Sequence, residues 1–164
     1  MQNQWHQHQL RVHYQDTDQM GVVHHANYVG WFEIGRTEMM RSVGIAYSDM
    51  ENLGLLLPVV NIDIQYRRPA RYDEIVSIFT NIISFSAVRL EFEYEIRLLE
   101  EDLYSTNSDS KQTIEPHGKL LTKGNTKHMW VDHDWKPTRI DKVAPEVFSL
   151  LQKKFGSKEI NSKR

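Results

Sequence analysis

Two aspartates and three histidines occur within sixteen consecutive residues, HYQDTDQMGVVHHANY, at positions 13–28. Asp16, Asp18, His24 and His25 are of the types that bind zinc, iron or manganese. The spacing argues against a metal, because adjacent histidines diverge in an extended segment and no HxH or HExxH pattern is present. We therefore expect no metal site and keep a metal-dependent hydrolase only as an alternative.

The composition and motifs of the chain argue against several other kinds of catalytic site. The 164 residues include no cysteine, which excludes disulfides, thiolate nucleophiles and zinc-thiolate sites. There is no GxSxG motif, so a serine hydrolase of the nucleophile-elbow type is not expected. A formal net charge of -2 gives no basic footprint for nucleic acid.

The remaining chemistry is a carboxylate beside the start of a helix. A strand precedes the DTDQMG segment and a helix follows it, so Asp18 is expected close to the first helical turn. Free N–H groups at a helix N-terminus carry about half an elementary charge and can stabilise an oxyanion. If the N–H of a residue such as His25 or Ala26 held an ester or thioester carbonyl, the carboxylate could attack it or activate water against it. The simpler interpretation is that Asp16 and Asp18 are turn residues, Asn27 is an N-cap and the histidines lie on the surface.

The elements around this segment follow from periodicity. Alternating residues over 10–14 predict a half-buried strand, and apolar residues at helical spacing over 28–43 predict an amphipathic helix of about four turns. Gly30 and Gly35 lie inside that helix, where each costs roughly 1 kcal/mol relative to alanine. We therefore expect a neighbouring element to press closely against both glycines.

The rest of the chain reads mainly as strands. Four are expected, over 59–66, 74–84, 88–98 and 119–131, with a short helical segment near 46–54 before them. The segment 104–118 is expected to be a loop, 132–142 a turn and 144–155 a terminal helix. This order indicates an α+β fold, an antiparallel sheet wrapped around one long central helix, with a short C-terminal helix.

The length fits one domain, which we place at 1–155, with a disordered polar tail at 156–164. The N-terminus is polar where a signal peptide would be apolar, and no apolar run could span a bilayer. We therefore expect a cytoplasmic protein with no integral membrane segment. A sheet with one helix leaves a face and an edge uncovered, so we also expect dimerisation.

The segment from Tyr14 to Arg41, YQDTDQMGVVHHANYVGWFEIGRTEMMR, resembles the signature of hotdog-fold acyl-CoA thioesterases of the 4-hydroxybenzoyl-CoA thioesterase type. The resemblance is greatest to the branch associated in bacteria with the Tol-Pal system. It includes the Asp-x-Asp pair, a glycine three residues later, His-Ala-Asn-Tyr and the FE..RTE helix, and it covers most of residues 8–140.

The resemblance implies roles for individual residues. Asp18 is the expected catalytic carboxylate, as nucleophile or general base, and the main-chain N–H of His25 is expected to polarise the thioester carbonyl. Asp16 would hold the loop through backbone hydrogen bonds. The expected substrate-binding residues are Tyr14, Gly21, Asn27, Arg67, Arg68 and Arg71, with the three arginines as candidates for the phosphates of CoA.

The sequence departs from this branch at His24, where an aromatic residue is common. The implied function is hydrolysis of acyl-CoA by a homodimer or homotetramer, with no cofactor because CoA is part of the substrate. An acyl carrier protein is a possible partner. The alternative is a non-hydrolytic acyl-CoA or acyl-carrier-protein binding module on the same fold.

Overall fold

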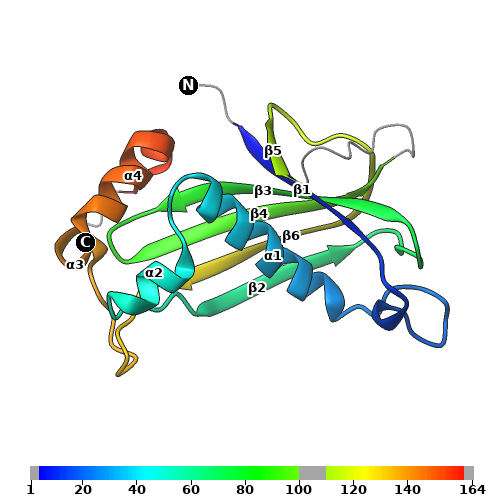
Figure 1. The fold of residues 1–164 in the computed structure, drawn as a ribbon, viewed down its shortest axis with the longest axis horizontal. Helices are drawn as coiled ribbons and strands as arrows, with labels where there is room; N and C mark the ends of the chain where they lie inside the picture. Colours follow the sequence, from blue (N-terminus) through cyan, green and yellow to red (C-terminus); the bar gives the residue numbers. More distant parts are fainter. Residues whose placement is uncertain (1–3, 100–109, 161–164) are drawn as a thin grey trace. The chain divides into compact units, whose positions relative to one another are not determined.

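Six strands and four α-helices make up the part of the chain that the structure, a computed structural model, describes, which is residues 4–99 and 110–160 (Figure 1). The strands are β1 (Trp5–Arg11), β2 (Val59–Tyr66), β3 (Ile75–Phe85), β4 (Arg89–Leu98), β5 (Ser110–Thr113) and β6 (Lys119–Met129). The α-helices are α1 (Asn27–Ser42), α2 (Tyr47–Asn52), α3 (Ile140–Val143) and α4 (Pro145–Phe155), and two 3-10 turns are η1 (Tyr14–Asp16) and η3 (Gly156–Lys158).

The strands form one sheet in the order β2-β6-β4-β3-β1-β5. β1 pairs antiparallel with β3 on one side, with His6 opposite Thr80, and antiparallel with β5 on the other, with Trp5 opposite Thr113. β2 is at one end of this order, so one of its edges has no neighbouring strand in the described part of the chain. In that part, no helix has the length and hydropathy that a membrane span requires.

The chain divides into two compact units. The first is built from the described residues within Met1–Met39, Ile64–Asn81 and Tyr94–Gly124. Its interior includes Phe32 of α1, whose ring stacks on that of Tyr94 of β4 with centroids 4.3 Å apart. The second unit comprises the described residues within Met40–Asp63, Ile82–Glu93 and Asn125–Arg164, and it includes α2, α3 and α4.

The close approach expected at the helix glycines occurs at one of them. A Cβ added to Gly35 would lie 2.5 Å from Thr80 Oγ1 and 2.6 Å from Ile78 Cγ2, both on β3. Gly35 therefore lets α1 pack against β3 more closely than any side chain would allow. The same expectation is wrong for Gly30, where an added Cβ would meet no heavy atom of the described residues within 4 Å.

Most of the expected elements are confirmed. The expected helix at 28–43 is α1, the four later strands are β2, β3, β4 and β6, and the terminal helix is α4. The central strand expected at 74–84 is β3, which is almost wholly buried. The short helical segment near 46–54 contains α2.

The strand expected at 10–14 is wrong in position, because β1 runs from Trp5 to Arg11. His13 instead begins a 3-10 turn, and Tyr14, expected on the buried face, is 78% exposed. The polar residues before Leu10 form a strand because β3 and β5 supply hydrogen-bond partners on both sides of it. A pattern of alternating hydropathy cannot predict such pairing.

Two further expectations need correction. The segment 104–118 contains β5 at Ser110–Thr113, whereas its residues 104–109 lie outside the described part of the chain. The tail expected to be disordered from 156 begins with η3, and Glu159 bridges Phe85 in the second unit. Lys158 Nζ also donates to the Ile82 carbonyl at 3.0 Å, so a half-buried cation holds this part of the tail in place. Residues 161–164 are not described.

Candidate active site

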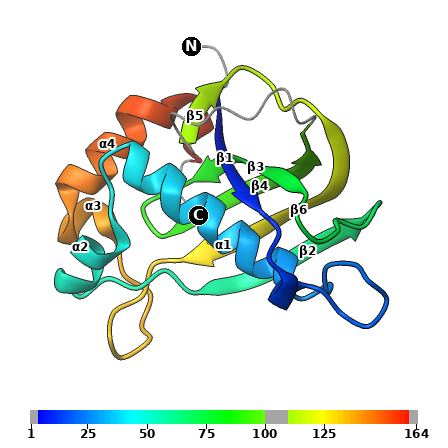
Figure 2. The same cartoon turned by 45° about the vertical axis from the view of Figure 1, so that its right-hand side comes forward.

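The segment leading into α1 is folded by main-chain contacts to Asp16. Asp16 Oδ2 accepts a hydrogen bond from the His13 N–H at 2.9 Å, which closes the turn η1. The Asp16 carbonyl oxygen accepts from the His24 N–H at 2.9 Å and from Asn27 Nδ2 at 2.7 Å. Asp16 thus ties the start of the loop to its end. Figure 2 shows this loop between β1 and α1. Asn27 is the first residue of α1 rather than its N-cap, and its side chain braces the loop.

Asp18 lies in a tight hairpin within this segment. Thr17 bridges Val23, and the Asp18 N–H donates to the Val22 carbonyl at 2.9 Å. Gly21 closes the turn at a φ of 77°, a conformation that glycine adopts without strain. Asp18 Oδ1 accepts from the Met20 N–H at 2.8 Å, which orients the half-buried carboxylate.

The second carboxylate oxygen, Asp18 Oδ2, accepts no hydrogen bond from the residues that the structure describes. One oxygen therefore anchors the carboxylate, and the other is available to a substrate or to water.

The main-chain donors at the start of α1 differ in their availability. The Ala26 N–H donates to His24 Nδ1 at 3.2 Å, and the His24 N–H is bound to Asp16. The His25 N–H has no acceptor within residues 4–99 and 110–160. This N–H lies two residues before the helix and is therefore available to donate to a ligand oxygen.

Two tyrosines that the sequence did not single out for the site lie beside it: Tyr66 contacts His25, and Tyr28 contacts Tyr66. Tyr66 Oη donates to the His25 carbonyl oxygen at 2.8 Å, and its ring lies edge-on to the Tyr28 ring with centroids 5.4 Å apart. Tyr28 is buried, and its Oη accepts from the Ala70 N–H at 3.0 Å. Burial raises the pKa of both phenols above its ordinary value, so both hydroxyls stay protonated at neutral pH.

These residues surround a cavity of about 270 Å³ in the first unit. The cavity brings together four of the predicted site residues, Asp18, His25, Arg67 and Arg68. It is completed by residues that are mainly apolar or aromatic, namely Met20, Val22, Val23, Tyr28, Tyr66 and Pro69. Asp18 and His25 thus line one cavity whose other walls are mainly apolar or aromatic, an arrangement that suits attack on a bound carbonyl group.

The other four predicted residues do not line this cavity. Tyr14 is exposed and its ring packs edge-on against Tyr72 at 5.7 Å. Gly21 and Asn27 shape the loop and the helix start rather than the cavity wall. The Arg71 N–H donates to Glu74 Oε1 at 2.6 Å, which places this residue in the turn before β3.

The histidines form no metal centre in this arrangement. His24 and His25 stack with ring centroids 4.3 Å apart, and His24 Nδ1 is used by the Ala26 N–H. Within residues 4–99 and 110–160, no three histidine, aspartate or glutamate side chains are grouped so that they could hold a metal ion.

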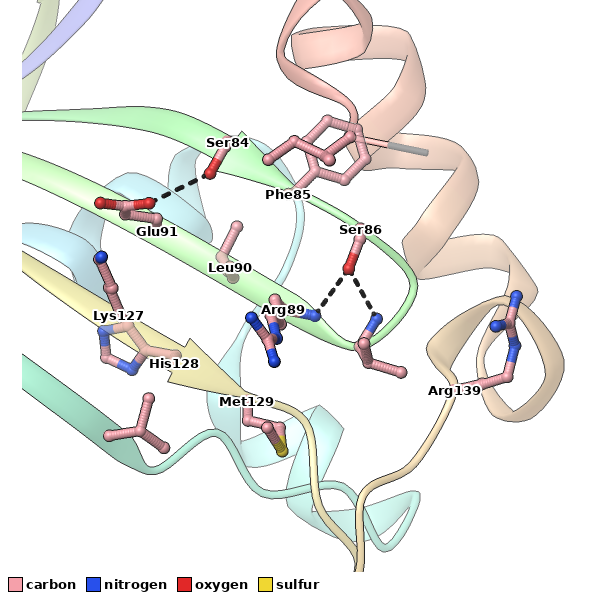
Figure 3. A pocket seen from close by; sticks show the side chains of 13 residues that line it. Ser84, Phe85, Ser86, Arg89, Leu90, Glu91, Lys127, His128, Met129 and Arg139 are labelled. Atoms are coloured by element: carbon pink, nitrogen blue, oxygen red, sulfur yellow. Dashed lines mark hydrogen bonds between the residues drawn. The ribbon is translucent and has the colours of Figure 1, made fainter. Parts of the chain in front are cut away.

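A larger cavity of about 600 Å³ lies in the second unit (Figure 3). Three cationic side chains contribute to its lining, Arg89 of β4, Lys127 of β6 and Arg139, and Arg139 is paired with Asp141 at 2.7 Å. Sequence reasoning did not find this cavity, because its residues come from separate strands and share no local motif. None of the predicted site residues lines it.

Comparison with known proteins identifies the family of this chain. The family model described as the Thioesterase-like superfamily matches residues 12–150. The chain is 34% identical over 146 residues to a putative acyl-CoA thioesterase, YneP, of Bacillus subtilis (strain 168), an alignment that covers 88% of this chain and 94% of the relative. It is 37% identical over 87 residues to the acyl-CoA thioester hydrolase YbgC of Escherichia coli O157:H7, covering 53% of this chain and 65% of the relative.

A solved structure of a thioesterase also has a similar fold. The solved structure of a DHNA-CoA thioesterase from Staphylococcus aureus matches with a TM-score of 0.76 and 29% sequence identity, covering 95% of this chain and 96% of that chain. The family model covers well over half of the chain, and so the chain belongs to the Thioesterase-like superfamily and has its hotdog fold.

Proposed function

We propose that this protein is an acyl-CoA thioesterase, which converts acyl-CoA and water into a carboxylic acid and free CoA. The observation that carries the proposal is the meeting of Asp18 and His25 in one cavity at the start of α1. The names of the relatives in Bacillus subtilis and Escherichia coli and of the Staphylococcus aureus structure support the same reaction class.

The proposed reaction begins with the thioester carbonyl oxygen accepting a hydrogen bond from the His25 N–H. The partial positive charge at the helix terminus stabilises the negative charge that develops on this oxygen. Because the donor belongs to the main chain, the imidazole of His25 is not required for this step.

Asp18 promotes attack on the carbonyl carbon by one of two routes. As a nucleophile, Asp18 Oδ2 bonds to the carbonyl carbon, the C–S bond breaks, and CoA leaves as a thiolate that takes up a proton. Water then hydrolyses the resulting anhydride. As a general base, Asp18 takes a proton from a water molecule, whose oxygen attacks the same carbon. The C–S bond then breaks, and the CoA thiolate takes up the proton from Asp18 as the carboxylic acid forms.

The CoA portion of the substrate is proposed to lie toward Arg67 and Arg68, which line the cavity and can pair with phosphate oxygens. Arg71 remains a proposed contact at its edge, with Tyr14, Gly21 and Asn27 as the other substrate-binding residues. No cofactor is proposed, and an acyl carrier protein is an alternative carrier of the acyl group.

We place the chain in the 4-hydroxybenzoyl-CoA thioesterase type, near the Tol-Pal-associated branch, with α1 as the central helix of a single domain and a cytoplasmic location. A homodimer or homotetramer is proposed because one edge of β2 has no neighbouring strand within residues 4–99 and 110–160, and because β2 exposes apolar side chains. Val60 is 58% exposed and Ile62 is 40% exposed.

The test is a CoA-release assay with a thiol reagent across short, long and aromatic acyl-CoAs, with acyl carrier protein thioesters run in parallel. The proposal expects turnover of at least one acyl-CoA that a chelator does not abolish. Tight binding of acyl-CoA without any CoA release would instead indicate a binding module. Activity lost to chelator and restored by a divalent ion would indicate a metal-dependent hydrolase.

A further inference from the structure

The peptide group between His25 and Ala26 is held at both ends. Its carbonyl oxygen accepts from Tyr66 Oη at 2.8 Å, and its N–H donates to His24 Nδ1 at 3.2 Å. On the other side, the N–H of His24 donates to the Asp16 carbonyl at 2.9 Å. The peptide that carries the His25 N–H therefore lies between two peptides whose orientations are fixed by hydrogen bonds.

The Tyr66 hydroxyl can hold the His25 carbonyl in place because the backbone and ring of Tyr66 are themselves held by neighbouring residues. It is the last residue of β2, and the N–H groups of Arg67 and Arg68 both donate to the Leu121 carbonyl, at 2.9 Å and 3.0 Å. Its ring also lies against that of Tyr28, a buried residue in the first turn of α1. Tyr66 thus joins the end of β2 to the start of α1, 41 positions apart along the chain.

This attachment bears on the proposed reaction because a main-chain oxyanion donor works only when it is held in place. The His25 N–H has no acceptor in the described part of the protein, so nothing it binds in the free enzyme fixes its direction. Its direction comes from its own peptide group, whose His24 carbonyl oxygen accepts from the Asn27 N–H at 2.9 Å, and from the adjacent peptides, one of which Tyr66 holds. Preorganised donors avoid a reorganisation cost at the moment of reaction, and small displacements of them lower the rate sharply.

We propose that Tyr66 is a positioning residue, which orients the main-chain N–H of His25 through the hydrogen bond from its hydroxyl to the His25 carbonyl. The inference rests on the proposed thioesterase function. It assigns no contact between the Tyr66 hydroxyl and the reacting atoms.

The first experiment compares Tyr66→Phe with the wild-type protein in the CoA-release assay. Phenylalanine keeps the ring beside Tyr28 and removes only the hydroxyl. We expect kcat to fall about tenfold, the rate equivalent of one hydrogen bond, with KM unchanged within about twofold. Tyr72→Phe is the matched control, since it removes the hydroxyl of another exposed tyrosine and should leave both constants unchanged.

The second experiment reads the His25 N–H directly. In protein labelled with ¹⁵N-histidine, the His25 amide resonance is identified by its loss in His25→Ala. It should shift in Tyr66→Phe and stay in place in Tyr72→Phe. An unmoved His25 resonance, an unchanged kcat, or a rise in KM alone would each overturn the inference.

The two proposals fail in different ways. If wild-type protein releases CoA and Asp18→Asn does not, while Tyr66→Phe matches the wild type, only the positioning role is wrong. If wild-type protein releases no CoA from any substrate, the proposed function fails and the positioning role fails with it.

Discussion

Within the candidate site, the two groups that the proposed reaction needs are oriented by the main chain. Asp18 Oδ1 is bound to the Met20 N–H, and the hairpin around it is closed by Thr17 and Val23. The donor at His25 is itself a main-chain group. At the residue scale, a substitution of His25 that keeps its N–H should therefore be milder than one that removes it.

His25 allows this difference to be tested at one position. His25→Ala keeps the N–H, so we expect kcat to fall less than tenfold. His25→Pro removes the N–H, and loss of one oxyanion donor typically lowers kcat by about 100-fold to 1,000-fold. Both variants are assayed by CoA release after circular dichroism confirms that they are folded. Equal loss of kcat in the two variants would show that the imidazole, and not the main chain, carries the effect.

The sequence predicted Asp18 and His25 because both lie in one continuous motif before a helix, and the resemblance of that motif to a known family assigned their roles. It did not predict the part played by Tyr66, whose contact with His25 depends on how β2 ends beside α1. Tyr28 was recognised as a residue of the helix face, but not as a wall of the cavity. A contact between positions so distant in sequence leaves no local pattern.

At the scale of elements, the distance between α1 and β3 is set by Gly35. An added methyl group there would overlap Thr80 Oγ1 and Ile78 Cγ2, whereas Gly30 has open space around it. Both residues lie in the same helix, so the intrinsic helix propensity of a substitution is similar at each.

This pair makes a controlled test of packing. Gly35→Ala should lower the free energy of unfolding by about 1 to 3 kcal/mol, because overpacking outweighs the gain in helix propensity. Gly30→Ala should raise it by up to about 1 kcal/mol. Urea denaturation followed by circular dichroism measures both changes. A stabilised Gly35→Ala protein would show that α1 does not approach β3 as closely as the structure describes.

The same elements show where sequence reasoning about the fold succeeded. β3, β4 and β6 are long and have strong hydropathy patterns, and they were predicted nearly to their ends. β1 was misplaced and β5 was missed because most of their residues are polar. Both are strands because they pair with each other. β1 also pairs with β3.

At the scale of the whole molecule, stability should depend on pH through a buried histidine. His6 of β1 is 1% exposed, and neither ring nitrogen has a hydrogen-bond partner in the described residues. Burial, with a smaller contribution from His8, lowers the pKa of His6 from 6.5 to about 4, although Glu38 opposes this change. The folded protein therefore holds His6 neutral at pH values where the unfolded chain binds a proton.

The sign of the effect follows from proton binding. Between pH 6.5 and about 4 the unfolded state binds more protons at His6, so the free energy of unfolding falls as the pH is lowered through this window. From pH 7 to pH 4.5 the contribution of His6 should be a loss of roughly 2 to 3 kcal/mol.

Urea denaturation at the two pH values, compared with His6→Gln, isolates this contribution from that of the carboxylates. The glutamine variant should lose less stability over the same interval. The same loss of stability in both proteins would contradict a depressed pKa at His6.

The central claim, that thioester hydrolysis depends on the Asp18 carboxylate as nucleophile or general base, is tested most directly by the kcat of Asp18→Asn. Asparagine retains an Oδ1 that can accept from the Met20 N–H, so the hairpin should stay folded while the negative charge is lost. Asp134→Asn, at an exposed loop position, is the control. We predict that kcat for CoA release falls at least about 100-fold in Asp18→Asn and is unchanged in Asp134→Asn. A kcat for Asp18→Asn equal to that of the wild type would contradict the account.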